Sequence, residues 1–167
     1  MPQRGLQIAH VDLKLINNAF QLRLLLEREA AARFCATVSD ADLAAIEDAH
    51  CRIVQRARSG AIDDALLTDA TTVDWGLHDL MIDALGNELI SEVYRINSLR
   101  VRLIRLEGSA LSAEALLPAM EEHLWFVAAL KARDPAEVAA RLTHHIESAH
   151  RRVLGLPRPP LPDRTRN

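Results

Sequence analysis

Apolar residues recur at every third or fourth position along most of the chain. They form long segments that are separated by short polar connections. This spacing is typical of amphipathic helices, and no segment alternates apolar and polar residues as a half-buried strand does. Asp12, Ser39 and Asp134 each begin such a segment with a side chain that can cap the N-terminus of a helix. The helices predicted on this basis span residues 12–38, 39–60, 62–85, 88–107, 112–132 and 134–155.

The third of these segments contains a polar run, Thr68–Thr72, that could cap a new helix. A break near Asp69 would divide the segment, so we expect six or seven helices in all. The joints between helices are short, which favours antiparallel neighbours. The pattern therefore predicts an all-α fold, an antiparallel bundle of six to seven helices.

The composition agrees with a helical bundle. Apolar residues make up 49% of the 167 positions and aromatic residues only 4%, while alanine and leucine, both good helix formers, dominate. This length suffices for one domain with a core of its own. We assign residues 1–11 to a linker remnant, 12–154 to the helical domain, and 155–167, which holds four of the seven prolines, to a disordered tail.

The charge and the cysteine content narrow the classes of function. A net charge of −3 argues against nucleic-acid binding by these residues, because such surfaces are usually basic. Cys35 and Cys51 are expected to be reduced thiols. Neither a membrane-spanning run nor a signal peptide is visible, so we expect a cytoplasmic protein.

Four polar residues fall on the apolar stripes of three different predicted helices. Asp74 and His78 are four residues apart and therefore share one helix face. His123 and His145 each occupy a core position in a later helix, whereas His144 is expected to face solvent. Three imidazoles and a carboxylate could form the ligand shell of a divalent metal. By spacing alone they could equally be hydrogen-bonded core residues.

A second candidate is the pair Arg23 and Glu27, which lies four residues apart in the first predicted helix. It could be an intrahelical ion pair, partly buried. Alternatively, Arg23 could present its guanidinium to a carboxylate ligand inside the bundle, because that group recognises carboxylates with two parallel hydrogen bonds. The remaining histidines, His10, His50 and His150, show no pattern.

Three stretches of the sequence resemble the ligand-sensing, all-helical C-terminal domain (FCD domain) of bacterial GntR-family transcriptional regulators, in the FadR-like branch. The first is FQLRLLLEREAAA (20–32), the second VDWGLHDLMIDALGNELI (73–90), and the third the region from Glu121 to His145. Leu77 departs from the family pattern, which usually has phenylalanine at this position. The resemblance covers about residues 10–154.

This resemblance implies a function. Asp74, His78, His123 and His145 match the family's ligands for a divalent metal, usually zinc, with nickel or another transition metal as alternatives. The metal would lie beneath a cavity for a small carboxylate or sugar acid, and Arg23 matches an arginine that can line this cavity. The family acts as homodimers whose N-terminal winged helix-turn-helix binds DNA. That DNA-binding domain is absent from this chain, so DNA binding is expected only through an N-terminal domain elsewhere.

We therefore expect a metal-dependent effector-sensing and dimerisation domain that is not an enzyme. Two alternatives remain open. A mononuclear metalloenzyme could use the same ligands to activate water, although no separate general base stands out. A purely structural dimerisation module would bind neither metal nor effector.

Overall fold

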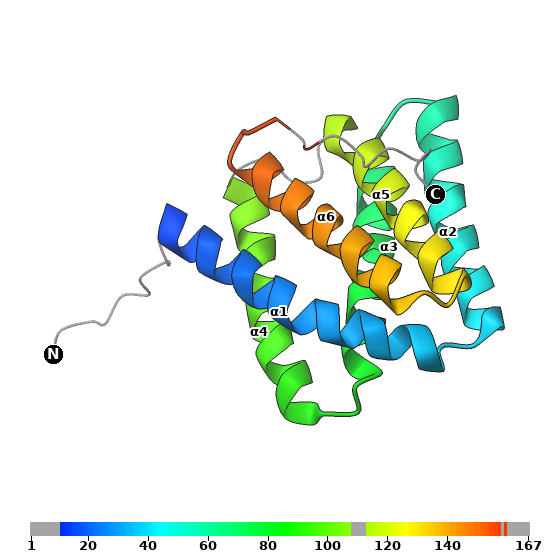
Figure 1. Cartoon of the computed structure of the whole chain (residues 1–167). Coiled ribbons are helices and arrows are strands. Elements are labelled where there is room, and N and C mark those ends of the chain that lie inside the picture. The colour runs from blue at the N-terminus through cyan, green and yellow to red at the C-terminus, as the bar shows by residue number, and fades with distance from the viewer. Residues whose placement is uncertain (1–10, 108–112, 158, 160–167) are drawn as a thin grey trace, which may run out of the picture.

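The computed structural model describes residues 11–107, 113–157 and 159 of the chain. Within these residues the fold is all-α, as predicted, and contains six helices and no strand (Figure 1). The helices are α1 (Leu13–Thr37), α2 (Asp40–Ser59), α3 (Asp64–Asp83), α4 (Glu88–Glu107), α5 (Ala113–Lys131) and α6 (Pro135–Val153). The expected linker and proline-rich tail lie mostly outside the described residues, so these two assignments stay predictions.

The predicted N-terminal caps are confirmed. The side chain of Asp12 accepts a hydrogen bond from the Leu15 amide at 2.7 Å, and Ser39 caps α2 in the same way. Asp134 accepts from two amides of the first turn of α6. These contacts satisfy amides that have no partner inside the helix, and therefore fix where each helix begins.

The possible break near Asp69 does not occur, because α3 is one continuous helix capped by Asp63. The hydroxyls of Thr68, Thr71 and Thr72 each donate to the carbonyl four residues earlier, at 2.8 to 3.0 Å. Threonine can make this bond inside a helix, so a threonine-rich run does not require a new N-terminus. The bundle thus has six helices in the described part of the chain.

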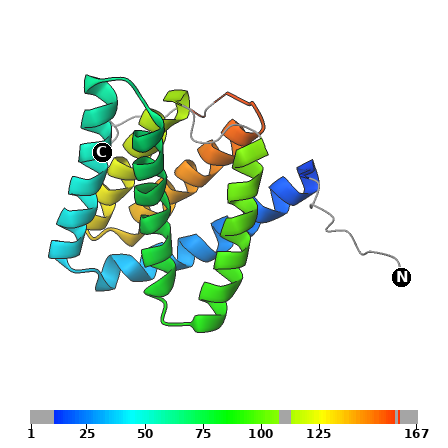
Figure 2. The same cartoon turned by 180° about the vertical axis from the view of Figure 1, so that it is seen from behind.

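Two helices end in left-handed glycines. Gly86 follows α3 with φ 63°, and Gly155 follows α6 with φ 66°. Glycine adopts this backbone conformation without steric cost, which allows the chain to turn sharply after each helix. The turn at Gly86 sends the chain from α3 back along the bundle as α4, as Figure 2 shows from behind.

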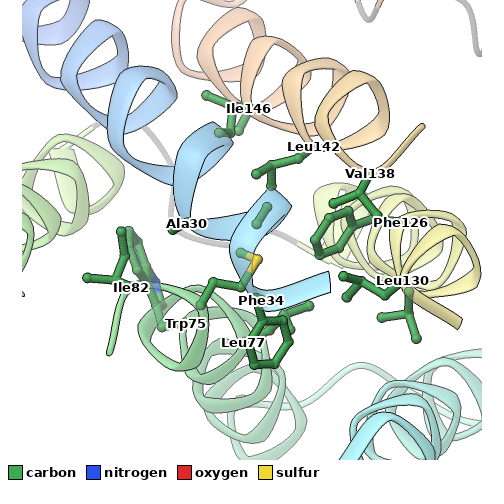
Figure 3. Packing of buried hydrophobic residues seen from close by; sticks show 14 of the residues in the cluster. Ala30, Phe34, Trp75, Leu77, Ile82, Phe126, Leu130, Val138, Leu142 and Ile146 are labelled. Carbon is green, nitrogen blue, oxygen red and sulfur yellow. The ribbon is translucent and has the colours of Figure 1, made fainter. Parts of the chain in front are cut away.

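The core lies where α1, α3, α5 and α6 meet. Helix α1 packs against α6, α4 and α3, while α5 packs against α6, α2 and α3. Figure 3 shows side chains from α1, α3, α5 and α6, among them Phe34, Trp75, Phe126 and Leu142, directed into one interior. The same interior receives the polar residues that the stripes predicted to be buried.

None of the helices formed by the described residues combines the length and the apolar character that crossing a membrane requires.

Candidate metal centre

Helices α3, α5 and α6 bring Asp74, His78, His123 and His145 together in the interior. Each side chain offers one donor atom, and these four atoms all lie within 4.8 Å of one another. All four residues are at most 2% exposed, as their positions on apolar stripes predict. Burial of four such groups is costly unless they are paired or bind a cation. Their hydrogen bonds therefore decide what the cluster can do.

The imidazole of His145 is held by a carboxylate on its Nδ1 side. Its Nδ1 lies 3.0 Å from Oε2 of buried Glu122, the residue beside His123 in α5. Arg152 in turn donates to both oxygens of Glu122, at 3.1 and 3.2 Å. Burial alone would raise the pKa of Glu122, but His145 and Arg152 outweigh it and lower the pKa to about 2. An ionised carboxylate only accepts hydrogen bonds, so Nδ1 of His145 carries the proton.

The imidazole of His78 has the same arrangement with Glu27 of α1. Nδ1 of His78 lies 2.7 Å from Oε2 of Glu27, although the angle departs from that of a well-aligned hydrogen bond. The Tyr94 hydroxyl donates to the other oxygen at 3.0 Å. Burial opposes ionisation of Glu27, yet Arg23 and His78 lower its pKa to about 2. Nδ1 of His78 therefore carries the proton as well.

The third imidazole, His123, is held by another histidine. Its Nδ1 lies 2.9 Å from Nε2 of His50, and Nδ1 of His50 lies 2.7 Å from the Ile46 carbonyl. Because the carbonyl only accepts, Nδ1 of His50 is the donor. Burial lowers the pKa of His50, which keeps it neutral, so its Nε2 accepts from Nδ1 of His123.

These three assignments leave every ligand imidazole with its lone pair on Nε2, and the lone pairs of His123 and His145 face each other. Nε2 of His123 lies 3.1 Å from Nε2 of His145 and 3.4 Å from Oδ1 of Asp74. Burial lowers the pKa of His123 well below its ordinary value and that of His145 to about 4, so neither is protonated at neutral pH. Two facing lone pairs repel, whereas a cation between them is attracted to both. The donor set therefore fits a divalent metal.

The spacing of the donors supports the same fit. Donors of a tetrahedral zinc ion lie about 3.4 Å apart, since zinc–nitrogen bonds are about 2.1 Å long. The separations of Nε2 of His123 from Nε2 of His145 and from Oδ1 of Asp74, 3.1 and 3.4 Å, already match this value. All four donors lie within 4.8 Å of one another, so shifts of about 1.4 Å at most would bring them around a single ion.

Arg23 contacts this cluster from α1. Its Nε donates to Oε1 of Glu27 at 2.5 Å, and its Nη2 lies 2.7 Å from Nε2 of His78. The guanidinium also stacks over the ring of Trp75. Burial would lower the pKa of Arg23, but Glu27 outweighs this and raises it above its usual value. The expected intrahelical pair with Glu27 therefore exists, and it is fully buried where partial burial was expected.

Two sequence-based interpretations of histidines were wrong. His50 had shown no pattern, yet it is buried against His123; Leu43, Ile46, His50, Ile53 and Ala57 form an apolar stripe of spacing three and four that could have revealed it. His144 was expected in solvent, but it is buried and its ring packs edge-on against Trp125. Helix α6 lies between α1 and α5, so two of its faces are covered.

The features described so far define a class: an all-helical bundle with a buried cluster of three histidines and one aspartate on three of its helices. The FCD domain family matches residues 18–148 of the sequence, and the chain belongs to this family. Membership is consistent with the resemblance to GntR-family regulators.

Solved structures support the fold. The FCD domain of TM0439, a candidate transcriptional regulator, resembles this chain in a metal-free form with a TM-score of 0.72 and in a Zn²⁺-bound form with 0.70. In both comparisons the sequence identity is 20%, and the match covers 88% of this chain and 96% of the other. No curated protein matches this sequence.

Proposed function

We propose that this chain is the metal-dependent effector-sensing and dimerisation domain of a bacterial GntR-family transcriptional regulator. The observation that carries the proposal is the buried cluster of three imidazoles and the Asp74 carboxylate, which each offer one donor atom within 4.8 Å of the others. The Zn²⁺-bound FCD domain of TM0439 adds support, because it shows that this fold can hold zinc.

In this proposal Asp74, His78, His123 and His145 hold the metal. Zinc is the first candidate, since imidazole and carboxylate are among its usual ligands, and nickel or another transition metal is the alternative. When bound, the metal would supply a Lewis acid that accepts an oxygen of a carboxylate ligand. Glu27, His50 and Glu122 orient the imidazoles by accepting their Nδ1 protons, a role that commonly strengthens metal binding.

We propose a small carboxylate or sugar acid as the effector, with Arg23 donating hydrogen bonds to it. A buried guanidinium beside the metal ligands can donate hydrogen bonds to the carboxylate oxygens of such an acid. The effector would regulate DNA binding only if it binds one arrangement of the helices better than another. DNA would be bound through a separate N-terminal domain, and two copies of the chain would form a homodimer.

A non-enzymatic role fits the electrostatics better than a metalloenzyme does. A general base works best with a pKa near the working pH. The carboxylates of Glu27 and Glu122 both have pKa values near 2 and are held by arginines, so neither is suited to take a proton from water. Turnover of an ester, amide or phosphate substrate by the zinc-loaded protein would favour the enzyme.

The metal site is tested by elemental analysis of the purified chain and its His123→Ala variant. We expect about one equivalent of zinc or a similar ion in the wild type and little in the variant, because one of four ligands is lost. His144→Ala is the matched control, since it removes a buried imidazole that does not belong to the cluster. Full metal content in His123→Ala, or none in the reconstituted wild type, would refute the site.

We further expect His50→Ala to weaken zinc binding about 10- to 100-fold, because His123 loses the acceptor that fixes its tautomer and orientation. Competition with a chromogenic chelator measures this affinity. His150→Ala should leave the affinity unchanged, as that ring stacks on Phe20 outside the cluster. Equal affinity in His50→Ala and wild type would show that His50 is only a packing residue.

A further inference from the structure

The outward face of α4 is unusually apolar. Among the residues that the structure describes, eight large hydrophobic side chains are exposed, and four of these belong to this one helix. They are Leu89 (74% exposed), Val93 (47%), Ile96 (46%) and Leu99 (64%). The other four are spread over α1, α3 and the segment after α6. Apolar side chains gathered on one exposed face usually mark an interaction surface.

These side chains lie opposite the face that α4 presents to the bundle. Tyr94, Asn97, Val101 and Ile104 are buried and direct α4 towards the rest of the protein. Helix α4 lies at the edge of the bundle, where it contacts α1 and α3 (Figure 2). The half-buried Leu103 extends the outward stripe by one more turn. The helix is therefore apolar on both sides, as expected of a helix that also packs against a partner.

Two charged residues of this face are available to such a partner. Glu92 and Arg100 are both exposed, and neither has an ion-pair partner within the described part of the chain. Arg95, by contrast, donates to both oxygens of Asp83 of α3, at 2.9 and 3.1 Å. The unpaired acid and base lie one turn to either side of Ile96.

We propose that the α4 face binds the α4 face of a second copy of this chain, antiparallel, with the two-fold axis at Ile96. In such a pair, residues equally far before and after Ile96 face each other. This places Val93 opposite Leu99, Leu89 opposite Leu103, and Glu92 opposite Arg100. Apolar residues of the stripe thus face apolar residues, and its charged residues face opposite charges. The stripe is therefore self-complementary, as an isologous dimer interface requires.

This inference rests on the proposed function, because it names the surface through which the sensor domain would form its homodimer. It places that surface on α4, whereas the metal cluster lies among α3, α5 and α6. Dimerisation and metal binding can therefore be tested independently on the same preparations.

The test is sedimentation equilibrium of the full chain and of charge-reversed variants. Glu92→Arg and Arg100→Glu should each raise the dimer dissociation constant at least tenfold, because each places like charges opposite one another twice per dimer. The double variant Glu92→Arg/Arg100→Glu restores opposite charges across the axis and should recover most of the wild-type affinity. Ile96→Ser should also weaken the dimer, whereas Leu80→Ser, which removes an exposed leucine of α3, should not.

A wild-type chain that stays monomeric would overturn the interface, as would a dimer that the single charge reversals leave intact or that the double variant fails to recover. Helical circular dichroism and zinc content should be unchanged in every variant, which shows that the bundle is folded. A chain that dimerises normally but takes up no metal on reconstitution would instead refute the metal site and leave the interface standing.

Discussion

Arg23→Met is expected to destabilise the metal-free protein by about 3–5 kcal/mol, because it leaves the buried carboxylate of Glu27 without its cation. Both side chains are almost completely inaccessible to water, so solvent cannot replace the lost partner. Urea unfolding followed by circular dichroism measures the change. An effect under 1 kcal/mol would show that Tyr94 and His78 suffice to hold the Glu27 charge.

Two controls separate this effect from the loss of any arginine. Arg52→Met breaks an exposed pair with Asp48 at the same spacing, and should cost less than about 1 kcal/mol. The double variant Arg23→Met/Glu27→Leu removes both buried charges and should recover much of the stability. Such a recovery would show that the unpaired carboxylate causes the loss of stability in Arg23→Met.

The same pair predicts a pH dependence. The pKa of Glu27 is about 2 in the folded protein and near 4.5 for an ordinary glutamate, so its ion pair stabilises the fold fully above about pH 4.5. This contribution is lost as the pH falls towards 2. The difference in stability between wild type and Arg23→Met should therefore shrink across that interval.

The helices were predictable because local chemistry sets them. Asp12, Ser39 and Asp134 begin helices in the structure as their capping chemistry requires, and Gly86 and Gly155 end them. Whether the third segment breaks near Asp69 stayed open in the sequence, because threonine hydroxyls can form two kinds of hydrogen bond. They can cap a new helix or bond to the preceding turn, and the sequence does not distinguish these until the packing of α3 is known.

The candidate site was predictable in part. The inward positions of His123 and His145 follow from periodicity, which also places Asp74 beside His78. Periodicity cannot show that His50 of α2 would meet His123 of α5, or that Glu27 of α1 would meet His78 of α3. Those contacts depend on which helices become neighbours, and that is a property of the whole bundle.

The position of Arg23 links the metal site to the proposed effector. In the structure its Nη2 donates towards Nε2 of His78, the lone pair that a metal would use. A guanidinium and a divalent ion cannot share that lone pair, so metal binding requires Arg23 to withdraw from His78. The released donor would then be available to an effector carboxylate, while Nε of Arg23 keeps its bond to Glu27.

Saturating zinc is expected to raise the melting temperature of the wild-type chain by roughly 8–16 °C. A ligand at a thousand times its dissociation constant stabilises the folded state by about 4 kcal/mol, and each kcal/mol shifts a domain of this size by about 2–4 °C. The shift should be larger in Arg23→Met, because the metal no longer competes with the guanidinium and its charge compensates Glu27. Differential scanning calorimetry with and without zinc measures both shifts. A smaller shift in Arg23→Met than in wild type would mean that Arg23 assists metal binding instead of opposing it.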